Sequence, residues 1–191
     1  MGIKDLFFKN KNYSSVGIEP SKEMQERYNK QIDVTLDYFL KLLVDSGRFN
    51  AYEIEKLVKR NKDIVFKSIT DGKLLDLTAK KKLNINSRKK VGDIYVQTLT
   101  DKGKIENASI DFFKNTYYQA FGIISRKYKL LELKRAGVKK CKISSSHDER
   151  DCPHVKRYEN KSFDIDEVPN LPLEGCTAIY CRCVFVASLD D

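Results

Sequence analysis

The chain has no run of apolar residues as long as the ~18 that a membrane-spanning helix requires. Its first residues, Met1 to Lys9, become charged too soon to form a secretory signal peptide. We therefore expect no membrane partner and synthesis in a reducing cytosol. In that compartment the five cysteines should be free thiols or metal ligands rather than a disulfide framework.

Internal repeats and low-complexity tracts are also lacking, so the 191 residues fit one domain or one domain with an appendage.

Charge is distributed unevenly along the chain. There are 36 Lys and Arg against 27 Asp and Glu, which gives a formal net charge of +9. Residues 151–191 have a net charge of −4, so residues 1–150 carry +13. A basic body of this kind predicts an anionic partner, although a highly charged solvated surface would give the same balance.

Apolar residues recur at three- and four-residue steps in three segments, and each pattern predicts a helix. The first covers residues 21–46 and is followed by Gly47. The second begins at Asn50, whose side chain should cap it, and ends at Gly72. The third is long and covers 107–135. The first two helices, joined by a short link, should form a hairpin.

After the third helix the pattern changes to alternation, which predicts short strands at 141–143, 163–165 and 180–187. The sequence thus predicts an α+β fold. A helical hairpin or bundle with a long helix should be followed by a small β-rich module, which a zinc ion could hold together.

We predict three parts of the chain. They are an N-terminal arm at 1–19, a helical body at 20–137 and the β-rich, cysteine-containing module at 138–191. Within the body, residues 73–105 should form shorter helices or irregular structure.

Four of the five cysteines fall in the last 40 residues. Zinc needs four soft or borderline ligands at tetrahedral positions. Cys181 and Cys183 are two apart in the expected strand, so their side chains should share a face. The simplest site joins them to Cys152 and Cys176, and His154 competes for one position.

Two other interpretations of the cysteines stay open. They could be buried free thiols of a small β core, or they could form a disulfide after release into oxidising surroundings. Cys141 precedes the cluster and is expected in the core. A structural zinc would benefit the module, since a domain of about 50 residues buries little apolar surface.

A charged cluster precedes the first of these cysteines, at His147–Asp151. Its carboxylates and imidazole could serve an open catalytic zinc as general base. The same residues also form an ordinary charged turn, and we predict that role. No catalytic residue is therefore assigned.

Basic residues gather in three short clusters that could contact nucleic-acid phosphates without reading bases. For any single lysine, a solvated position is the more common explanation of the pattern. Tyr and Phe fall mostly at helical core spacing, which argues against base-stacking platforms. The candidate phosphate contacts are Lys80, Lys81, Lys82, Arg88, Lys89, Lys90, Lys139 and Lys140.

An ordered series of motifs runs through the C-terminal part of the chain. It comprises Ala136-Gly137-Val138, Lys142-Ile143-Ser144, Asp148-Glu149-Arg150-Asp151-Cys152-Pro153, Asn160-Lys161-Ser162-Phe163, Pro169, Leu171-Pro172-Leu173 and Cys181-Arg182-Cys183. This order resembles the phage head morphogenesis family, also called the phage Mu F-like minor head protein family. The resemblance covers about residues 110–187.

The sequence departs from the family pattern at two positions. The second cysteine of the family's cysteine turn is replaced by Val155, and the histidine that commonly precedes Cys-Arg-Cys is replaced by Ala178. His154 and Cys176 are near enough in sequence to replace them.

The resemblance implies a structural minor head protein of a bacteriophage virion and not an enzyme. Such proteins are made in the bacterial cytoplasm and reside in the head or neck. They act in head assembly, DNA packaging or DNA delivery, with the portal protein, the major capsid protein and packaged double-stranded DNA as partners and no small-molecule substrate. The alternatives are a toxin-like effector enzyme, either a nuclease or an ADP-ribosyltransferase, and a zinc-stapled nucleic-acid-binding protein.

Overall fold

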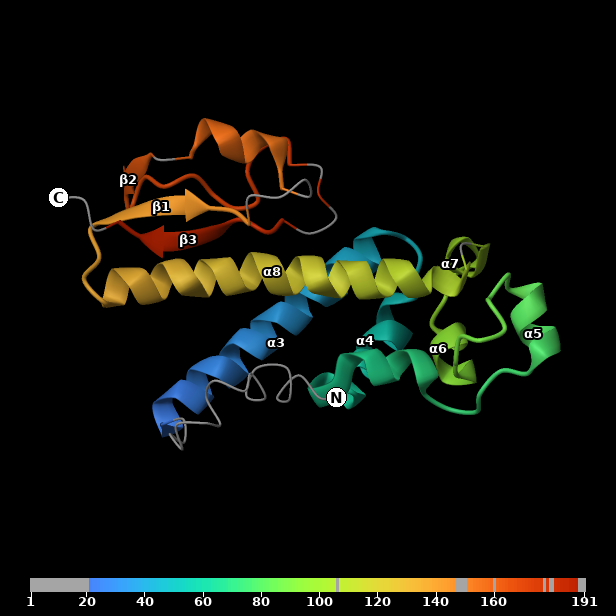
Figure 1. Ribbon diagram of the computed structural model, residues 1–191. Coiled ribbons are helices and arrows are strands. Elements are labelled where there is room, and N and C mark those ends of the chain that lie inside the picture. The colour runs from blue at the N-terminus through green and yellow to red at the C-terminus, as the bar shows by residue number, and fades with distance from the viewer. Residues whose placement is uncertain are drawn as a thin grey trace. The chain divides into compact units, whose positions relative to one another are not determined.

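The computed structural model of the chain describes residues 21–105, 107–146, 151–159, 161–176, 178 and 181–188 (Figure 1). The predicted arm at 1–19 and residues 147–150 lie outside this description. By contact, the chain divides into two compact units, Met1–Thr116 and Tyr117–Asp191. The division falls within the long helix. The boundary at 137/138 that we inferred from the sequence stays a prediction.

The first helix of unit 1, α3 (Lys22–Asp45), lies where its apolar stripe predicts it. Ser21 caps its start, because the Ser21 hydroxyl accepts a hydrogen bond of 3.2 Å from the backbone N–H of Met24. Gly47 follows its end. Both boundaries could therefore be predicted from local sequence.

The second helix, α4 (Ala51–Arg60), begins as expected after Asn50. The Asn50 side chain accepts a hydrogen bond of 3.1 Å from the backbone N–H of Glu53. However, the chain then continues as a 3-10 segment, η1 (Lys62–Thr70), and the prediction of one helix as far as Gly72 is wrong.

The break between α4 and η1 is at Asn61. The Asn61 side-chain amide donates to the carbonyl of Leu57 at 3.1 Å and to the carboxylate of Asp71 at 2.8 Å. A side chain that bonds to nearby backbone offers the chain an alternative to continuing the helix. Ile64, which the helical stripe would bury, has non-helical backbone angles and is exposed.

The predicted region of short helices, 73–105, does contain three of them before the long helix. Their bounds, with the elements that follow them, are α5 (Leu77–Lys82), α6 (Asp93–Gln97), α7 (Asp101–Ile105), the 3-10 turn η2 (Asn107–Ser109) and the long helix α8 (Ile110–Arg135). None of the helices in the described residues is both long and apolar enough to cross a membrane.

Aromatic rings form the centre of the unit 1 core. The Phe113 ring of α8 meets the Phe39 ring edge-on at a centroid distance of 5.0 Å, and it meets the Tyr95 ring in the same way at 5.6 Å. The Tyr95 hydroxyl donates to the carbonyl of Ala108 at 3.0 Å, which satisfies its buried polar end. Burial raises the pKa of Tyr95. The start of α8 is thus a core element of unit 1.

Unit 2 contains a three-stranded antiparallel sheet in the order β2-β1-β3. Its strands are β1 (Lys140–Ser144), β2 (Ser162–Asp164) and β3 (Val184–Ala187). Cys141 of β1 is buried opposite Phe163, and Ile143 is buried opposite Phe185. The mixture of helices with a small antiparallel sheet confirms the α+β prediction at this coarse level.

The last strand is shorter than predicted. β3 begins at Val184, whereas the alternating pattern predicted a strand from 180. Cys181 and Cys183 therefore lie in an irregular segment just before the strand, and the shared-face argument for them does not apply. Both are nonetheless buried, within a unit 2 core made up of Leu133, Cys141, Ile143, Cys152, Val155, Ile165, Leu171, Leu173, Cys181, Cys183 and Phe185.

Candidate metal centre

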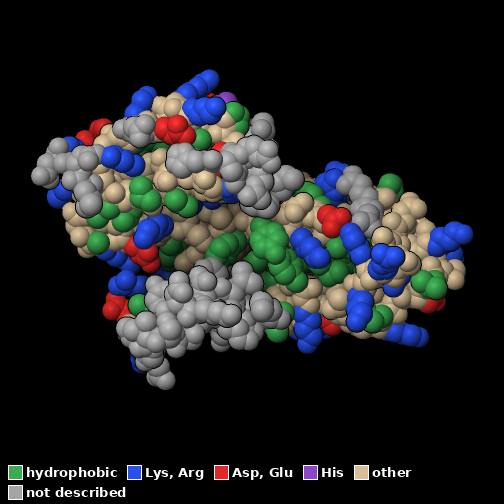
Figure 2. Space-filling view, in the orientation of Figure 1, with side chains coloured by type: hydrophobic (Ala, Val, Ile, Leu, Met, Phe, Trp, Pro, Cys, Tyr) green, Lys and Arg blue, Asp and Glu red, His purple; other side chains and the backbone are tan. Residues whose placement is uncertain are grey.

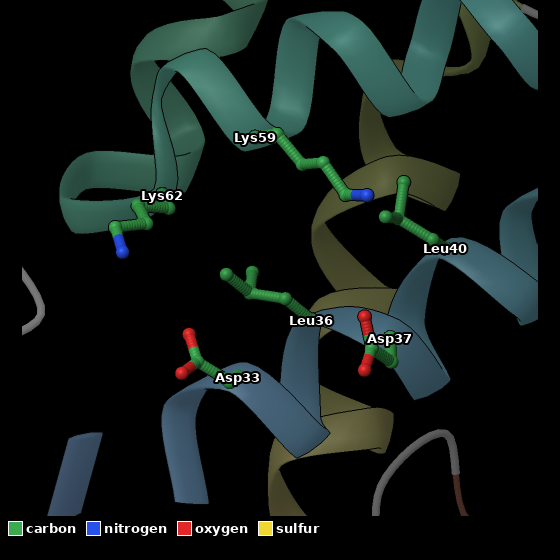
Figure 3. Close-up of a pocket in the computed structure, with 6 residues that line it drawn as sticks. All are labelled: Asp33, Leu36, Asp37, Leu40, Lys59 and Lys62. Carbon is green, nitrogen blue, oxygen red and sulfur yellow. The ribbon is translucent and has the colours of Figure 1, made fainter. Parts of the chain in front are cut away.

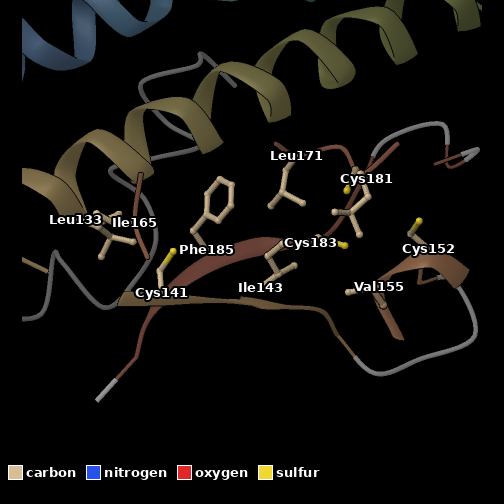
Figure 4. Packing of buried hydrophobic residues seen from close by; sticks show 11 residues of the cluster. Leu133, Cys141, Ile143, Cys152, Val155, Ile165, Leu171, Cys181, Cys183 and Phe185 are labelled. Atoms are coloured by element: carbon tan, nitrogen blue, oxygen red, sulfur yellow. The ribbon is translucent and has the colours of Figure 1, made fainter. Parts of the chain in front are cut away.

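Three of the predicted metal ligands lie in one part of the unit 2 core (Figure 4). Cys152 immediately precedes the 3-10 segment η3 (Pro153–Arg157), and Cys181 and Cys183 precede β3. In Figure 4, Cys141 lies at the opposite end of the cluster from Cys152. That position agrees with the expectation that Cys141 belongs to the core rather than to the site.

The fourth cysteine completes the group. Hydrogen bonds link the thiols in a chain that runs from Cys152 to Cys176, from Cys176 to Cys181 and from Cys181 to Cys183. Cys176 is half-buried and the other three are buried. The fold thus brings all four predicted thiols together from three separate segments.

The hydrogen bonds and burial give the thiols different pKa values. The hydrogen bond from Cys183, supported by the Arg126 guanidinium, lowers the pKa of Cys181 to about 6. The same hydrogen bond, together with burial, raises the pKa of Cys183. Burial raises the pKa of Cys176 to about 11. Without a metal, the group therefore favours one thiolate, at Cys181.

His154 lies beside this group. A Cβ atom added to Gly175 would lie 3.1 Å from both Cε1 and Nε2 of the His154 ring, so the imidazole packs over that glycine. Gly175 also has a φ of +77°, a conformation that L side chains rarely adopt. The imidazole thus lies next to Gly175, the residue that precedes Cys176. That His154 could replace one of the cysteines as a ligand stays a prediction.

Sequence reasoning missed Arg126, a buried residue of α8. Its guanidinium Nη1 donates to the carbonyl of Cys181 at 2.8 Å. Local sequence alone predicts a solvent-exposed position for an arginine within a helix. The available signal was Gly122, one helical turn earlier, because a glycine inside a helix indicates that another group needs its space.

The charged turn at 147–151 is described only at Asp151. The Asp151 carboxylate lies 3.6 Å from the guanidinium of Arg182, and the Asp151 side chain is 10% exposed. The prediction of a charged turn at 147–151 rather than a general base stays a prediction, because the other residues of the cluster lie outside the described residues.

The donor chemistry of the four thiols fits zinc. Four cysteines are a typical ligand set of closed structural zinc sites, and Zn–S bonds of about 2.3 Å put tetrahedral sulfurs about 3.8 Å apart, close to direct contact. Within the described residues, no group of three or more His, Cys, Asp or Glu side chains is already arranged to hold a metal ion. Binding would therefore require the thiols to exchange their mutual hydrogen bonds for metal bonds.

Six of the predicted phosphate contacts belong to one region of unit 1. Lys80 donates from Nζ to the carbonyl of Ser87 at 3.0 Å, which ties α5 to the loop that carries the second basic cluster. In that loop Lys89 pairs with Asp111 at 3.0 Å. Figure 2 shows Lys and Arg side chains gathered around this end of the unit. The region contains Lys80, Lys81, Lys82, Arg88, Lys89 and Lys90.

The other two predicted contacts, Lys139 and Lys140, are in unit 2. Lys139 is exposed, and Lys140 is the first residue of β1. They therefore do not belong to the same structural unit as the α5 cluster.

Unit 1 also contains a pocket of about 410 Å³ between α3 and α4 (Figure 3). Asp33 and Asp37 of α3 line one side, and Lys59 and Lys62 line the other. Lys59 already pairs with Glu55 at 2.6 Å. The opposite charges across the pocket balance, so it has no preference for an anion or a cation that would identify a ligand.

Comparison with known proteins identifies no relative. Nothing among the models of known protein families, the curated proteins or the solved structures matches the chain.

Proposed function

We propose that the chain is a structural minor head protein of a bacteriophage virion and not an enzyme. In this proposal its C-terminal unit is held together by zinc, and its basic surface faces packaged DNA. The observation that carries the proposal is the placement of the C-terminal motifs: their described residues all lie in unit 2, some in strands β1 and β2 and others at the turns that lead into its strands.

The helix-stop motif illustrates this placement. Gly137 follows α8 with a φ of +78°, and its N–H donates to the carbonyl of Lys134 at 3.0 Å. The backbone N–H of Val138 donates to the carbonyl of Leu133 at 3.1 Å. This turn directs the chain from α8 into β1, which is the role that the helix stop would have in the family.

The two cysteine motifs have corresponding roles. The backbone N–H of Val155 donates to the carbonyl of Cys152 at 3.0 Å, which starts the turn of η3. Cys181 and Cys183 lead into β3, the strand that pairs with β1. The motifs that are far apart in sequence therefore converge on the thiol group, as a zinc-stapled module requires.

The small size of unit 2 is the reason for including zinc in the proposal. A bound zinc ion would supply a cross-link between three segments that otherwise depend on a modest core. Cys152, Cys176, Cys181 and Cys183 would hold it, and His154 is the candidate replacement for one of them.

The partners proposed are the portal protein, the major capsid protein and double-stranded DNA. The basic cluster around α5 supports non-specific contact with phosphates, because such contact needs exposed positive charge and no base-reading geometry. Lys81, Lys82, Arg88 and Lys90 are exposed. The location that follows is the virion, in the head or the neck.

Mass spectrometry of purified phage particles tests this proposal. We expect peptides of the chain in particles that also contain portal and major capsid peptides, at a lower copy number than the capsid protein. A cytosolic enzyme of the same host serves as the contamination control. Particles that contain portal and capsid peptides but none from this chain would overturn the proposal.

A further inference from the structure

Arg126 is a buried charge in unit 2. Its residue exposure is 8%, and the charge would be costly to bury without a negative partner. Nη1 donates to the carbonyl of Cys181 at 2.8 Å. The Nε atom is also buried, and it has no hydrogen-bond partner among the residues that the structure describes. The guanidinium therefore has an unused donor, Nε–H, in a buried part of the unit.

The backbone of α8 makes room for this guanidinium. A Cβ atom added to Gly122 would lie 3.2 Å from Nη1, 3.5 Å from Nη2 and 3.7 Å from Cζ of Arg126. The side chain thus folds back over the preceding turn of its own helix. A side chain at position 122 would therefore press on Nη1, and the guanidinium would have to shift by a few tenths of an ångström to make room for it.

The negative groups that act on Arg126 are thiols. Burial lowers the pKa of Arg126, and the sulfurs of Cys181, Cys183 and Cys176 oppose that change. Without a metal, Cys181 supplies the main negative charge near this arginine, and the sulfurs of Cys176 and Cys183 would add to it once they are deprotonated.

We infer that Arg126 is the charge-compensating partner of the zinc centre and is preorganised by Gly122 to face the metal-bound thiolates. The inference rests on the zinc centre proposed above. Four thiolates on one Zn²⁺ leave a net charge of about −2, which a buried site must offset. A guanidinium whose Nε–H has no partner among the described residues offsets it by charge and by a hydrogen bond to sulfur.

The ligand set follows from the hydrogen bonds that already join the four thiols to one another. We therefore assign Cys152, Cys176, Cys181 and Cys183 as the ligands, with His154 outside the first coordination shell. On this assignment His154→Ala keeps its zinc.

The experiment compares full-length variants at position 126. Arg126→Met keeps the apolar stem and removes the charge, while Arg126→Lys keeps the charge and loses the planar guanidinium group. Arg135→Met, an exposed arginine in the last turn of the same helix, is the matched control. Zinc content is measured by elemental analysis, zinc affinity by competition with a chromophoric chelator, and the thiolate set by the charge-transfer bands of the cobalt-substituted protein.

We expect Arg126→Met to bind zinc about ten- to a hundredfold more weakly than the wild type. At saturating cobalt its charge-transfer bands should be of full intensity. Arg126→Lys should recover most of the affinity, and Arg135→Met should bind like the wild type. The metal-free Arg126→Met protein should lose little thermal stability, since without zinc Arg126 faces the single thiolate of Cys181 rather than four metal-bound thiolates.

Three results would overturn the inference: wild-type affinity in Arg126→Met, equal losses in the Met and Lys variants, or parallel losses of zinc affinity and metal-free stability. The last pattern would mark Arg126 as merely structural. If Arg126→Met fails to fold, Arg126→Gln takes its place with the same expected loss. A wild-type protein that binds no zinc would instead refute the zinc centre itself, so the two failures are distinguishable.

Discussion

The Asp151 carboxylate lies 3.6 Å from the Arg182 guanidinium, with side-chain exposures of 10% and 21%. Asp151 directly precedes Cys152, and Arg182 stands between Cys181 and Cys183. This ion pair therefore joins the two cysteine motifs of unit 2 through side chains next to the cysteines, independently of any metal. It prepositions the thiols before an ion could do so.

Replacing Asp151 tests the contribution of the Asp151–Arg182 ion pair. Asp151→Asn should lower the free energy of unfolding of unit 2 by about 1–3 kcal/mol, because Arg182 would lose the counter-charge of a largely buried pair. Hydrogen exchange at the amides of β1 and β3 measures the loss. Asp166→Asn is the matched control, since the Asp166 side chain is 81% exposed in its pair with Lys134 and should matter by less than about 0.5 kcal/mol. Equal effects of the two changes would argue against a stabilising role of the Asp151–Arg182 pair.

Removing two of the thiols should remove the metal. Cys181→Ser combined with Cys183→Ser is expected to reduce zinc from about one ion per chain to none and to loosen unit 2. Elemental analysis and thermal unfolding measure the two effects. Cys141→Ala is the matched control, because Cys141 is equally buried but lies away from the site. It should keep its zinc, and metal loss in this variant would contradict the ligand assignment.

The bend at Asn61 should respond to acid. The hydrogen bond from Asn61, with help from Arg60, holds the pKa of Asp71 below its ordinary value of 3.8. A lowered carboxyl pKa stabilises the folded state above pH 3.8, and this stabilisation is lost as the pH falls toward the folded pKa. Urea denaturation of unit 1 between about pH 5 and about pH 2.5 should show the loss. In Asp71→Asn the dependence should be flatter; an unchanged profile would contradict the assignment.

The basic cluster around α5 should carry much of the DNA affinity. Replacing Lys80, Lys81 and Lys82 together by Gln should weaken binding to a random-sequence duplex and reduce the log–log salt slope by about two to three. Fluorescence anisotropy over a salt series measures both. A variant with Gln at Lys56, Lys62 and Lys67 has the same net charge and serves as control. If both triple variants lose affinity equally, overall charge rather than this cluster is responsible.

Local signals predicted both ends of α3 and the start of α4, whereas a longer-range contact decides where α4 ends. Ser21 and Asn50 cap helices through residues three positions away, so their effect can be read from the sequence. The break at Asn61 depends on Asp71, ten residues further along, and no periodic pattern contains that hydrogen bond.

The candidate site was predicted to a similar extent. Cysteine spacing identified the four thiols, because residues of one chemical kind crowd into a short segment. It could not identify Arg126, whose partner Cys181 is 55 residues away. The expected strand geometry of Cys181 and Cys183 was also wrong, since the edge strand starts only at Val184.

The thiol group has a further consequence for how the length of the chain can vary. An ion held by Cys152, Cys176, Cys181 and Cys183 would close loops of very different lengths. The entropy of closing a loop changes slowly with its length, by about 0.6 kcal/mol for each doubling. Insertions or deletions between Cys152 and Cys176 should therefore be tolerated where they fall outside η3, β2 and the core residues of that segment, whereas the single residue between Cys181 and Cys183 should not vary in number. Relatives of this chain would then share the short spacing and differ in the long one.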